Sequence, residues 1–220
     1  MDLYDVMRTT FAARQFQDEQ VSDSTLHHIL ENARFAPSGG NRQGWKIIVI
    51  KDVKKRASLG PIISQVMRRY RAQVAAGENP YNTVVPSQVT QSDIDAVTLP
   101  EGFTEQFTHA PILLMVLVDL SVVASMDSEL DRVGVVSGAS IYPFVWNILL
   151  AARHEGLGGT ITTFTTVHEP EVRKLFNIPA NYAVCALLPI GKPIKQLTKL
   201  KRNPVSAFTT VDTFDGASFG

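Results

Sequence analysis

The chain has 220 residues, of which 45% are hydrophobic and 19% are charged. This length fits one large domain or two small ones, and so apolar a composition excludes general disorder because it can bury a large core. The 21 Lys and Arg residues equal the 21 Asp and Glu residues, whereas a protein that binds nucleic acid over its whole surface is expected to be basic. The low charged fraction also indicates that part of the surface is hidden in an oligomer.

Cys185 is the single cysteine, so the sequence can form no internal disulfide and no cysteine metal cluster. We therefore expect a reducing, cytoplasmic setting. The cysteine lies in the apolar run 183–188, which indicates a buried small hydrophobe rather than a nucleophile. At the N-terminus, Asp2 and Asp5 stand where a signal peptide needs cations, so no secretory leader is predicted.

Hydrophobic periodicity in the first half of the chain predicts helices over 2–10, 24–35 and 53–76 and a strand over 45–50. Ser22 or Asp23 can cap the second helix, because a short side-chain oxygen accepts hydrogen bonds from the free amides of the first turn. This helix is expected to end before Pro37-Ser38-Gly39-Gly40, a turn sequence with two residues free to adopt positive φ.

The second half predicts strands over 112–120, 160–163 and 182–189 and helices over 132–154 and 169–176. Interleaved helices and strands favour an α/β or α+β fold. The twenty residues between Arg132 and Arg153 carry no charge and are long enough to span a bilayer. Their mixed composition, which includes Pro143 and Asn147, instead favours a helix buried in protein, so no membrane partner is predicted.

Two segments of the single predicted domain, residues 1–220, have unusual charge. Residues 77–107 lie in a region without Lys or Arg, contain three prolines and lack clear periodicity, which is typical of a lid or a mobile loop. Residues 192–220 are predicted to form an irregular tail. The beginning of this tail, 192–202, carries five cations and no acid, which indicates either a solvated face or a phosphate site.

Common catalytic motifs do not occur. Gly156, Gly158 and Gly159 follow a predicted helix and precede a predicted strand, which is the reverse of the order in a dinucleotide-binding fingerprint. His154-Glu155 lacks the second histidine of a zinc helix, and the sequence holds no Walker motif or nucleophile elbow. We therefore predict no metal site and no catalytic side chain.

Four separated segments instead match the motifs of one family: Arg14 with its neighbours, 36–45, Thr162-Thr163 after a glycine turn, and 200–204. The four segments occur in the same order as in that family. By these motifs the chain resembles the FMN-dependent nitroreductase family along nearly its whole length, nearest to the branch that contains iodotyrosine deiodinase. One motif departs: Thr10-Phe11-Ala12-Ala13 precedes Arg14 where the family usually has Arg-Arg-Ser and one further residue. The missing arginine and serine normally help to hold the FMN phosphate and ribityl chain.

The resemblance implies an FMN site shared between two subunits. Arg14 would face the pyrimidine edge of the flavin ring, Thr162 and Thr163 its N5 and O4 atoms, and Arg202 with Lys201 the phosphate, which suits a guanidinium fork. The implied cofactor-binding residues are Arg14, Pro37, Ser38, Gly39, Gly40, Asn41, Gln43, Thr160, Thr162, Thr163, Lys201 and Arg202. The implied substrate contacts are Gly40, Arg68, Tyr70 and Arg71.

The implied fold is α+β, with a mostly antiparallel sheet wrapped by helices in an intertwined homodimer. The helix from about Arg132 to His154 would lie at the dimer core, and the C-terminal tail would cross onto the partner. The implied activity is ping-pong reduction, in which NAD(P)H reduces FMN and a nitroaromatic, quinone or related small acceptor reoxidises it, so the cofactor carries the chemistry. A reductive dehalogenase of halogenated phenols and a non-catalytic flavin-storage or sensor protein are the alternatives.

Overall fold

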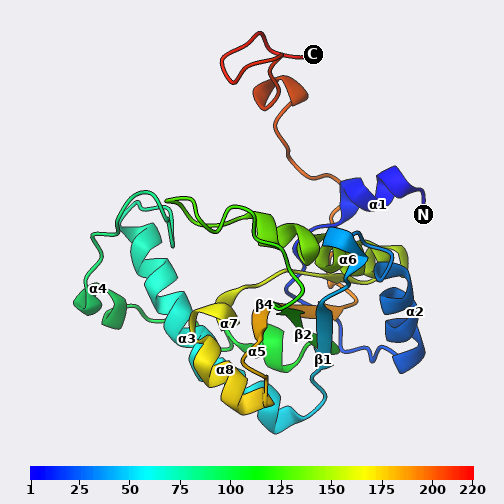
Figure 1. Ribbon diagram of the computed structural model, residues 1–220. Coiled ribbons are helices and arrows are strands. Elements are labelled where there is room, and N and C mark those ends of the chain that lie inside the picture. The colour runs from blue at the N-terminus through cyan, green and yellow to red at the C-terminus, as the bar shows by residue number, and fades with distance from the viewer.

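The computed structural model describes all residues from Met1 to Gly220 (Figure 1). Its centre is a four-stranded antiparallel sheet with the strand order β1-β2-β4-β3. The strands are β1 (Trp45–Val49), β2 (Ile112–Asp119), β3 (Gly158–Gly159) and β4 (Tyr182–Gly191). The expected α+β fold with an antiparallel sheet is confirmed.

Helices cover both faces of this sheet, with α2 and α6 on one side and α3 and α8 on the other (Figure 1). The α-helices are α1 (Leu3–Thr9), α2 (Asp23–Ala33), α3 (Val53–Ala75), α4 (Gln91–Asp95), α5 (Glu105–Thr108), α6 (Tyr142–His154), α7 (Phe164–Val167) and α8 (Glu169–Phe176). Three short 3₁₀ helices complete the list: η1 (Gly39–Asn41), η2 (Val136–Ser140) and η3 (Val205–Ala207). The Ser22 hydroxyl caps α2, as predicted, by accepting from the Thr25 N–H.

The unbroken apolar sequence of β2 follows from burial on both faces. Successive side chains of a strand point to opposite sides, so Leu114 and Val116 join the core beneath α2 and α6. Leu113 and Met115 join a second core beneath α3 and α8. All four are fully buried. Cys185 is also buried, and burial raises the pKa of its thiol to about 12, which fits the predicted small hydrophobe.

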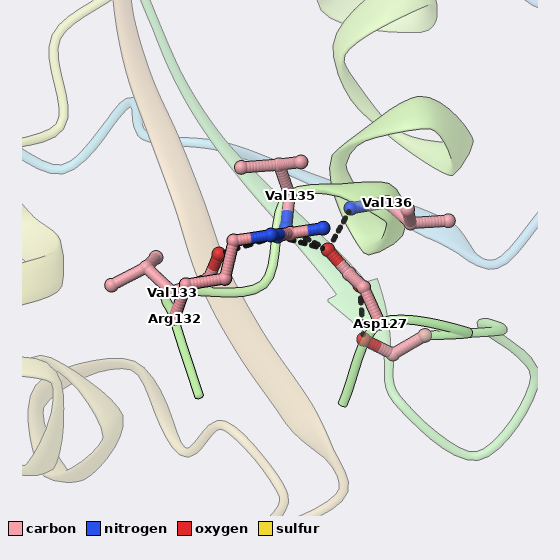
Figure 2. Close-up of polar contacts among 6 residues, drawn as sticks. Asp127, Arg132, Val133, Val135 and Val136 are labelled. Atoms are coloured by element: carbon pink, nitrogen blue, oxygen red, sulfur yellow. Dashed lines mark hydrogen bonds and ion pairs between the residues drawn. The ribbon is translucent and has the colours of Figure 1, made fainter. Parts of the chain in front are cut away.

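The predicted helix over 132–154 is wrong in its first half, because α6 begins at Tyr142 and η2 precedes it. The buried carboxylate of Asp127 holds the chain in another path by accepting from the backbone N–H groups of Val135 and Val136 at 2.7 and 3.3 Å (Figure 2). Arg132 Nη1 pairs with the same carboxylate at 2.8 Å. These contacts use amides that a continuous helix would have bonded internally.

Pro143 lies in the first turn of α6, where a missing N–H costs nothing. The uncharged run is therefore a loop, a short 3₁₀ turn and a helix of 13 residues. No helix of the structure is both long enough and apolar enough to cross a membrane.

Two further expectations need correction. The predicted strand over 160–163 is absent: β3 ends at Gly159, and Thr162 forms only an isolated bridge to Leu187 before α7 begins. The stretch 77–107 is more regular than predicted, since it contains α4 and the start of α5. By contrast, residues beyond about 200 leave the body as the predicted irregular tail (Figure 1).

Candidate functional site

A cavity of about 340 Å³ lies where α3, α5 and the chain after β3 meet the segment that follows α1. It brings together five predicted site residues, namely Arg14, Tyr70, Thr160, Thr162 and Thr163. The other residues of its wall are Met67, Phe103, Gln106, Phe107, Ile161 and Phe164. The predicted cofactor residues from two distant parts of the sequence therefore share one cavity.

Arg14 reaches this cavity because its segment pairs with β3. The Ala13 N–H donates to the Gly159 carbonyl at 3.0 Å, and Ala12 forms a parallel bridge with the same glycine. A Cβ at Gly159 would lie 2.7 Å from the Pro189 carbonyl oxygen, so this close approach requires glycine. The exposed guanidinium of Arg14 forms no ion pair and contacts only the Ala12 carbonyl at 3.4 Å. Its charge is free to meet an anionic ligand.

Thr162 is fixed by its backbone and leaves its hydroxyl without a partner. Its N–H and carbonyl exchange hydrogen bonds with Leu187 at 3.0 and 2.8 Å. Its Oγ1 is buried and has no hydrogen-bond partner within the protein. Burial of such a group costs free energy, and a ligand in the cavity that hydrogen-bonds to the hydroxyl would remove this cost.

Gln106 is a second polar side chain of the same kind, and the sequence analysis missed it. Its Nε2 donates to the Phe103 carbonyl at 3.2 Å, but its buried Oε1 accepts no hydrogen bond. The side chain lines the cavity from α5. Nothing in the sequence distinguishes this glutamine from the other polar residues of the stretch 77–107; its position in the cavity wall is visible only in three dimensions.

Aromatic rings form another part of the cavity wall. Phe164, the first residue of α7, packs edge-to-face with Tyr70 of α3 at 6.5 Å and with Phe107 of α5 at 6.4 Å between ring centroids. Aromatic walls of this kind favour a flat conjugated ligand. The cavity can thus accept a planar ring on its apolar side and hydrogen-bond it at its polar edge.

A neighbouring cavity of about 480 Å³ shares Arg14, Phe103 and Gln106 with the first. Its wall adds two carboxylates, those of Glu101 and Glu105. Arg14 therefore lines both a cavity without carboxylates and a cavity with two of them, and these two acids lie within the stretch 77–107.

Four predicted cationic residues do not line the cavity. Arg68 and Arg71 are exposed on α3, on either side of Tyr70. Lys201 and Arg202 lie on the projecting tail, where Arg202 Nη1 donates to the Lys201 carbonyl at 2.8 Å (Figure 1). Only Tyr70 of the predicted substrate contacts reaches the cavity wall.

The glycine loop with Pro37, Ser38, Gly39, Gly40, Asn41 and Gln43 is also remote from the cavity. It enters β1, whereas the cavity threonines follow β3, and these two strands form opposite edges of the sheet. Gly40, Asn41 and Gln43 have positive φ values of 60, 53 and 51°. Such backbone is costly for residues other than glycine and is often found at functional sites.

Two hydrogen bonds maintain this strained loop. The Gln43 N–H donates to the Ser38 hydroxyl at 2.9 Å, and the Gly39 N–H donates to the Ser140 hydroxyl at 3.1 Å. Its residues 39–43 are exposed, and the loop lies at the β1 edge of the sheet, whereas the cavity lies at the β3 edge. The residues predicted to form one site therefore lie in two separate places on a single chain.

Several known proteins resemble the chain in sequence and in fold. It is 27% identical over 203 residues to iodotyrosine deiodinase of Thermotoga neapolitana, covering 92% of the chain and 95% of that relative. It is 26% identical to nitrobenzene nitroreductase of Ectopseudomonas oleovorans, covering 85% of each. An oxidised iodotyrosine deiodinase solved with FMN and 3-iodo-L-tyrosine superimposes with a TM-score of 0.68 and 25% identity, over 97% of this chain and 100% of that one.

The Nitroreductase family model matches residues 7–192, which include the cavity, the glycine loop and the whole sheet. This match and the similarity to a deiodinase confirm the resemblance stated from the motifs. The chain belongs to the Nitroreductase family, a family of flavoprotein oxidoreductases.

Proposed function

We propose that the protein is an FMN-dependent oxidoreductase that takes reducing equivalents from NAD(P)H and passes them to nitroaromatic, quinone or related small acceptors. The observation that carries this proposal is the unpartnered hydroxyl of Thr162 beside the unpaired Arg14 in an aromatic-walled cavity. A flavin ring would give the Thr162 hydroxyl a hydrogen-bond partner. Its pyrimidine edge becomes negatively charged on reduction, and the Arg14 cation would stabilise that charge. The residues present therefore fit FMN.

Each wall residue has a defined task in this proposal. Arg14 holds the pyrimidine edge, where its charge favours the reduced, anionic ring. Thr160, Thr162 and Thr163 hydrogen-bond the opposite polar edge, and Gln106 accepts from a ring N–H. When bound, FMN supplies the two-electron chemistry by accepting a hydride and returning electrons to an acceptor. The protein's own contribution is binding, orientation and exclusion of water.

The proposed site needs a second subunit, because the glycine loop cannot reach the cavity of its own chain. An apolar surface supports a homodimer: Val135 before η2, and Tyr142 and Trp146 of α6, are exposed around a hollow of about 720 Å³. A contiguous exposed apolar patch usually marks an interface. In the dimer, the loop of one protomer completes the cavity of its partner, with Gly40 against the substrate.

The tail is proposed to cross onto the partner, where Lys201 and Arg202 would approach the FMN phosphate. Phe208 and Phe214 are exposed on this tail, and Phe214 makes almost no contact with its own chain. Exposed aromatic side chains on a projecting segment are typical of contacts with another chain. The lone buried cysteine is compatible with the cytoplasm as the site of action.

Reductive dehalogenation of halogenated phenols is the second candidate function. It is favoured by the similarity to iodotyrosine deiodinase and to the structure with bound 3-iodo-L-tyrosine. Tyr70 at the cavity wall could stack on a phenol ring. Arg68 and Arg71, proposed as further substrate contacts, flank Tyr70 and would need to turn toward the cavity mouth.

The test is anaerobic reduction followed by reoxidation of the purified protein. A yellow protein that NADH or NADPH bleaches within seconds, and that nitrobenzene or a quinone restores, supports the first function. Restoration by a halophenol with release of halide supports the second. A yellow protein that resists both reductants would be a storage or sensor protein, and a colourless protein that takes up no added FMN would contradict the proposal.

A further inference from the structure

We propose that Arg153 is an anchor for a phosphomonoester, and that the ligand it holds is the phosphate end of FMN. The inference rests on the proposed FMN site. Arg153 lies in the last turn of α6, outside the cavity described above. None of the family motifs contains it, and its guanidinium lies where α1, α6 and the beginning of the tail meet.

One edge of the Arg153 guanidinium is fixed by the hydroxyl of Thr9. Arg153 Nε donates to Thr9 Oγ1 at 3.0 Å, and Thr9 Oγ1 donates its own hydrogen to the Asp5 carbonyl at 2.6 Å. The hydroxyl is thereby held as an acceptor for the arginine. The two terminal nitrogens of the half-buried Arg153 have no hydrogen-bond partner, and the side chain forms no ion pair. An oriented fork of donors is what phosphate recognition requires.

The basic beginning of the tail is attached at the same point. Gln196 Nε2 donates to the Thr9 carbonyl at 3.0 Å and to the Leu197 carbonyl at 2.8 Å. The tail leaves the body beside α1 (Figure 1). Lys195 and Lys199, which flank this attachment in sequence, form no ion pair. The segments that meet at Thr9 therefore carry three cations without an ion pair, namely Arg153, Lys195 and Lys199; of the two acids nearest in these segments, Glu155 pairs with His28 at 3.6 Å and the exposed Asp5 forms no ion pair.

Two parallel segments connect this junction to the cavity. One runs from Thr9 to Arg14 and the other from Arg153 to Thr160, and they pair through the parallel bridge between Ala12 and Gly159. Thr9 and Arg153 thus lie at one end of the pair, while Arg14 and Thr160 lie in the cavity wall at the other. Five residues of extended chain reach at most about 18 Å. A ligand with its ring in the cavity and a phosphate on a flexible chain can therefore meet Arg153.

The segment between the two ends offers no other cation. Residues 10–13 are Thr, Phe, Ala and Ala, and the Thr10 hydroxyl is used by the Val6 carbonyl at 2.7 Å. A dianionic phosphate at this place would have Arg153 as its fixed guanidinium partner. A purely structural role is the competing explanation, because a cation in the last turn of a helix also stabilises the helix dipole.

Comparison of FMN with riboflavin, which lacks the phosphate, separates these explanations. We would titrate apo-protein with each flavin and follow flavin fluorescence, using the parent protein, Arg153→Ala and Arg153→Lys. The matched control is Arg8→Ala, which removes a neighbouring cation in the last turn of α1 that lies over the Tyr4 ring. Thermal unfolding of each apo-protein provides the measure of folding.

The expected result is an increase of about tenfold or more in the Kd for FMN in Arg153→Ala, as for loss of one charge-assisted hydrogen bond. The Kd for riboflavin should not change, Arg153→Lys should recover part of the loss, and Arg8→Ala should leave both constants as in the parent. A purely structural role of Arg153 would weaken the binding of both flavins equally. An equal increase in the two Kd values would therefore overturn the proposal, as would an unchanged Kd for FMN.

Two further outcomes would show which part of the proposal is wrong. If the parent protein binds neither flavin, the proposed function itself fails, and the anchor with it. If Arg153→Ala binds FMN normally but loses preference for NADPH over NADH in stopped-flow reduction, the phosphate belongs to the reductant and the assignment to FMN is wrong.

Discussion

The backbone N–H of Gly39 donates to the hydroxyl of Ser140 across 101 positions of sequence, at a distance of 3.1 Å. Ser140 is buried and ends η2, directly before α6, whose exposed face carries Tyr142 and Trp146. The strained glycine loop and the proposed subunit interface are thus joined by one hydrogen bond. If the proposed second subunit packs on α6, this hydrogen bond would connect its interface to the loop that is proposed to complete the flavin site.

Substitution of Ser140 by Ala should weaken FMN binding through this loop. The Gly39 N–H would lose its acceptor, which typically costs about 1 kcal/mol, or roughly fivefold in affinity. Fluorescence titration with FMN measures the effect. Ser137→Ala, in the same 3₁₀ turn but without a hydrogen bond to the loop, is the control. Equal affinities for the two variants would show that the loop does not contribute to the site.

Thr162→Val should separate cofactor binding from stability. Since Thr162 Oγ1 has no partner, its replacement by an isosteric apolar group should leave the apo-protein equally stable or more stable by about 1 kcal/mol. FMN affinity should fall, because the proposed contact is lost. Calorimetry of the apo-protein and FMN titration give the two values.

Thr165 provides the matched control for this experiment. Its Oγ1 is likewise buried without a partner, but the residue does not line the cavity. Thr165→Val should therefore stabilise the apo-protein and leave FMN affinity unchanged. A parallel loss of affinity in both valine variants would mean that packing, and not the Thr162 hydroxyl, determines FMN binding.

Asp127 should give the protein a specific acid sensitivity. Hydrogen bonds from Val135 N–H and from Arg132 lower the pKa of its carboxyl to about 2, below the usual ~3.9. Because the folded state favours the charged form, this stabilisation is complete above about pH 4 and is lost as the pH falls toward 2. Asp127→Asn should lower Tm at neutral pH and flatten the Tm profile between these values.

The exposed Asp131 lies in the same loop and makes no hydrogen bond through its side chain, so Asp131→Asn is the control for Asp127. Its Tm profile should follow that of the parent protein. If Asp127→Asn and the parent lose stability in parallel below pH 4, another carboxyl group is responsible for the acid limb.

The sequence predicted those elements whose stabilising contacts lie close by in the chain, and it did not predict those whose shape depends on distant residues. The second and eighth helices and the long strands were predictable because their caps and apolar periods are local. The helix predicted to begin at Arg132 was wrong because the Asp127 carboxylate accepts hydrogen bonds from the N–H groups of Val135 and Val136. No periodic pattern in the sequence reveals this contact. The strand predicted over 160–163 was wrong because only Thr162 pairs with the sheet, through one bridge to Leu187, before α7 begins.

The residues of the candidate site also fall into those that the sequence predicted and those that it did not. Arg14 and the threonines were found because motif spacing places them, and the cavity brings them together. Gln106 was missed because its significance lies in an unbonded buried oxygen, which exists only once the fold has formed. Lys201 and Arg202 carry the right chemistry, but the tail that bears them projects from the body, so their task remains a prediction that depends on a partner chain.

The apolar surface on α6 should support an obligate dimer. Trp146→Glu places a charge beside Val135 and Tyr142 in the hollow, and the interfaces of obligate dimers bury more than about 2,000 Å². Sedimentation at micromolar concentration should show a dimer for the parent protein and a monomer for the variant. Val53→Glu, exposed at the start of α3 on the other side of the sheet, should remain dimeric. A folded parent monomer that binds FMN would contradict both the dimer and the shared site.

We propose that the stretch 77–107 is a lid that selects the electron acceptor; in the structure its beginning is held by hydrogen bonds and its end lines the cavity. The Glu78 carboxylate accepts from the Ser87 hydroxyl at 2.6 Å and the Gln88 N–H at 2.6 Å, so the loop is folded back onto the end of α3. At its other end, Phe103 and Gln106 enter the cavity wall. The middle of the stretch lies between these two ends, and we propose that it covers the cavity mouth.

Charge gives this lid its expected selectivity. The stretch contains no Lys or Arg, and Glu101 and Glu105 line the second cavity beside Arg14. Acidic groups at a mouth repel anionic acceptors and favour neutral or cationic ones. Arg68 and Arg71 on α3 would offset this repulsion for NAD(P)H if they face the mouth in the working enzyme.

Replacement of residues 78–100 by a short glycine linker tests the lid while Phe103 and Gln106 remain. FMN should stay bound, since the cavity wall is retained, but the ratio of reoxidation rates for anionic and neutral acceptors should change, because the linker removes Glu78, Asp93 and Asp95 while Glu101 and Glu105 remain. Stopped-flow traces of both half-reactions with a neutral and a carboxylated nitroaromatic give this ratio. Glu78→Ala, which releases the beginning of the loop without removing it, should shift the ratio in the same direction by a smaller amount. Rates that match the parent for every acceptor in both variants would show that the stretch is an ordinary surface loop.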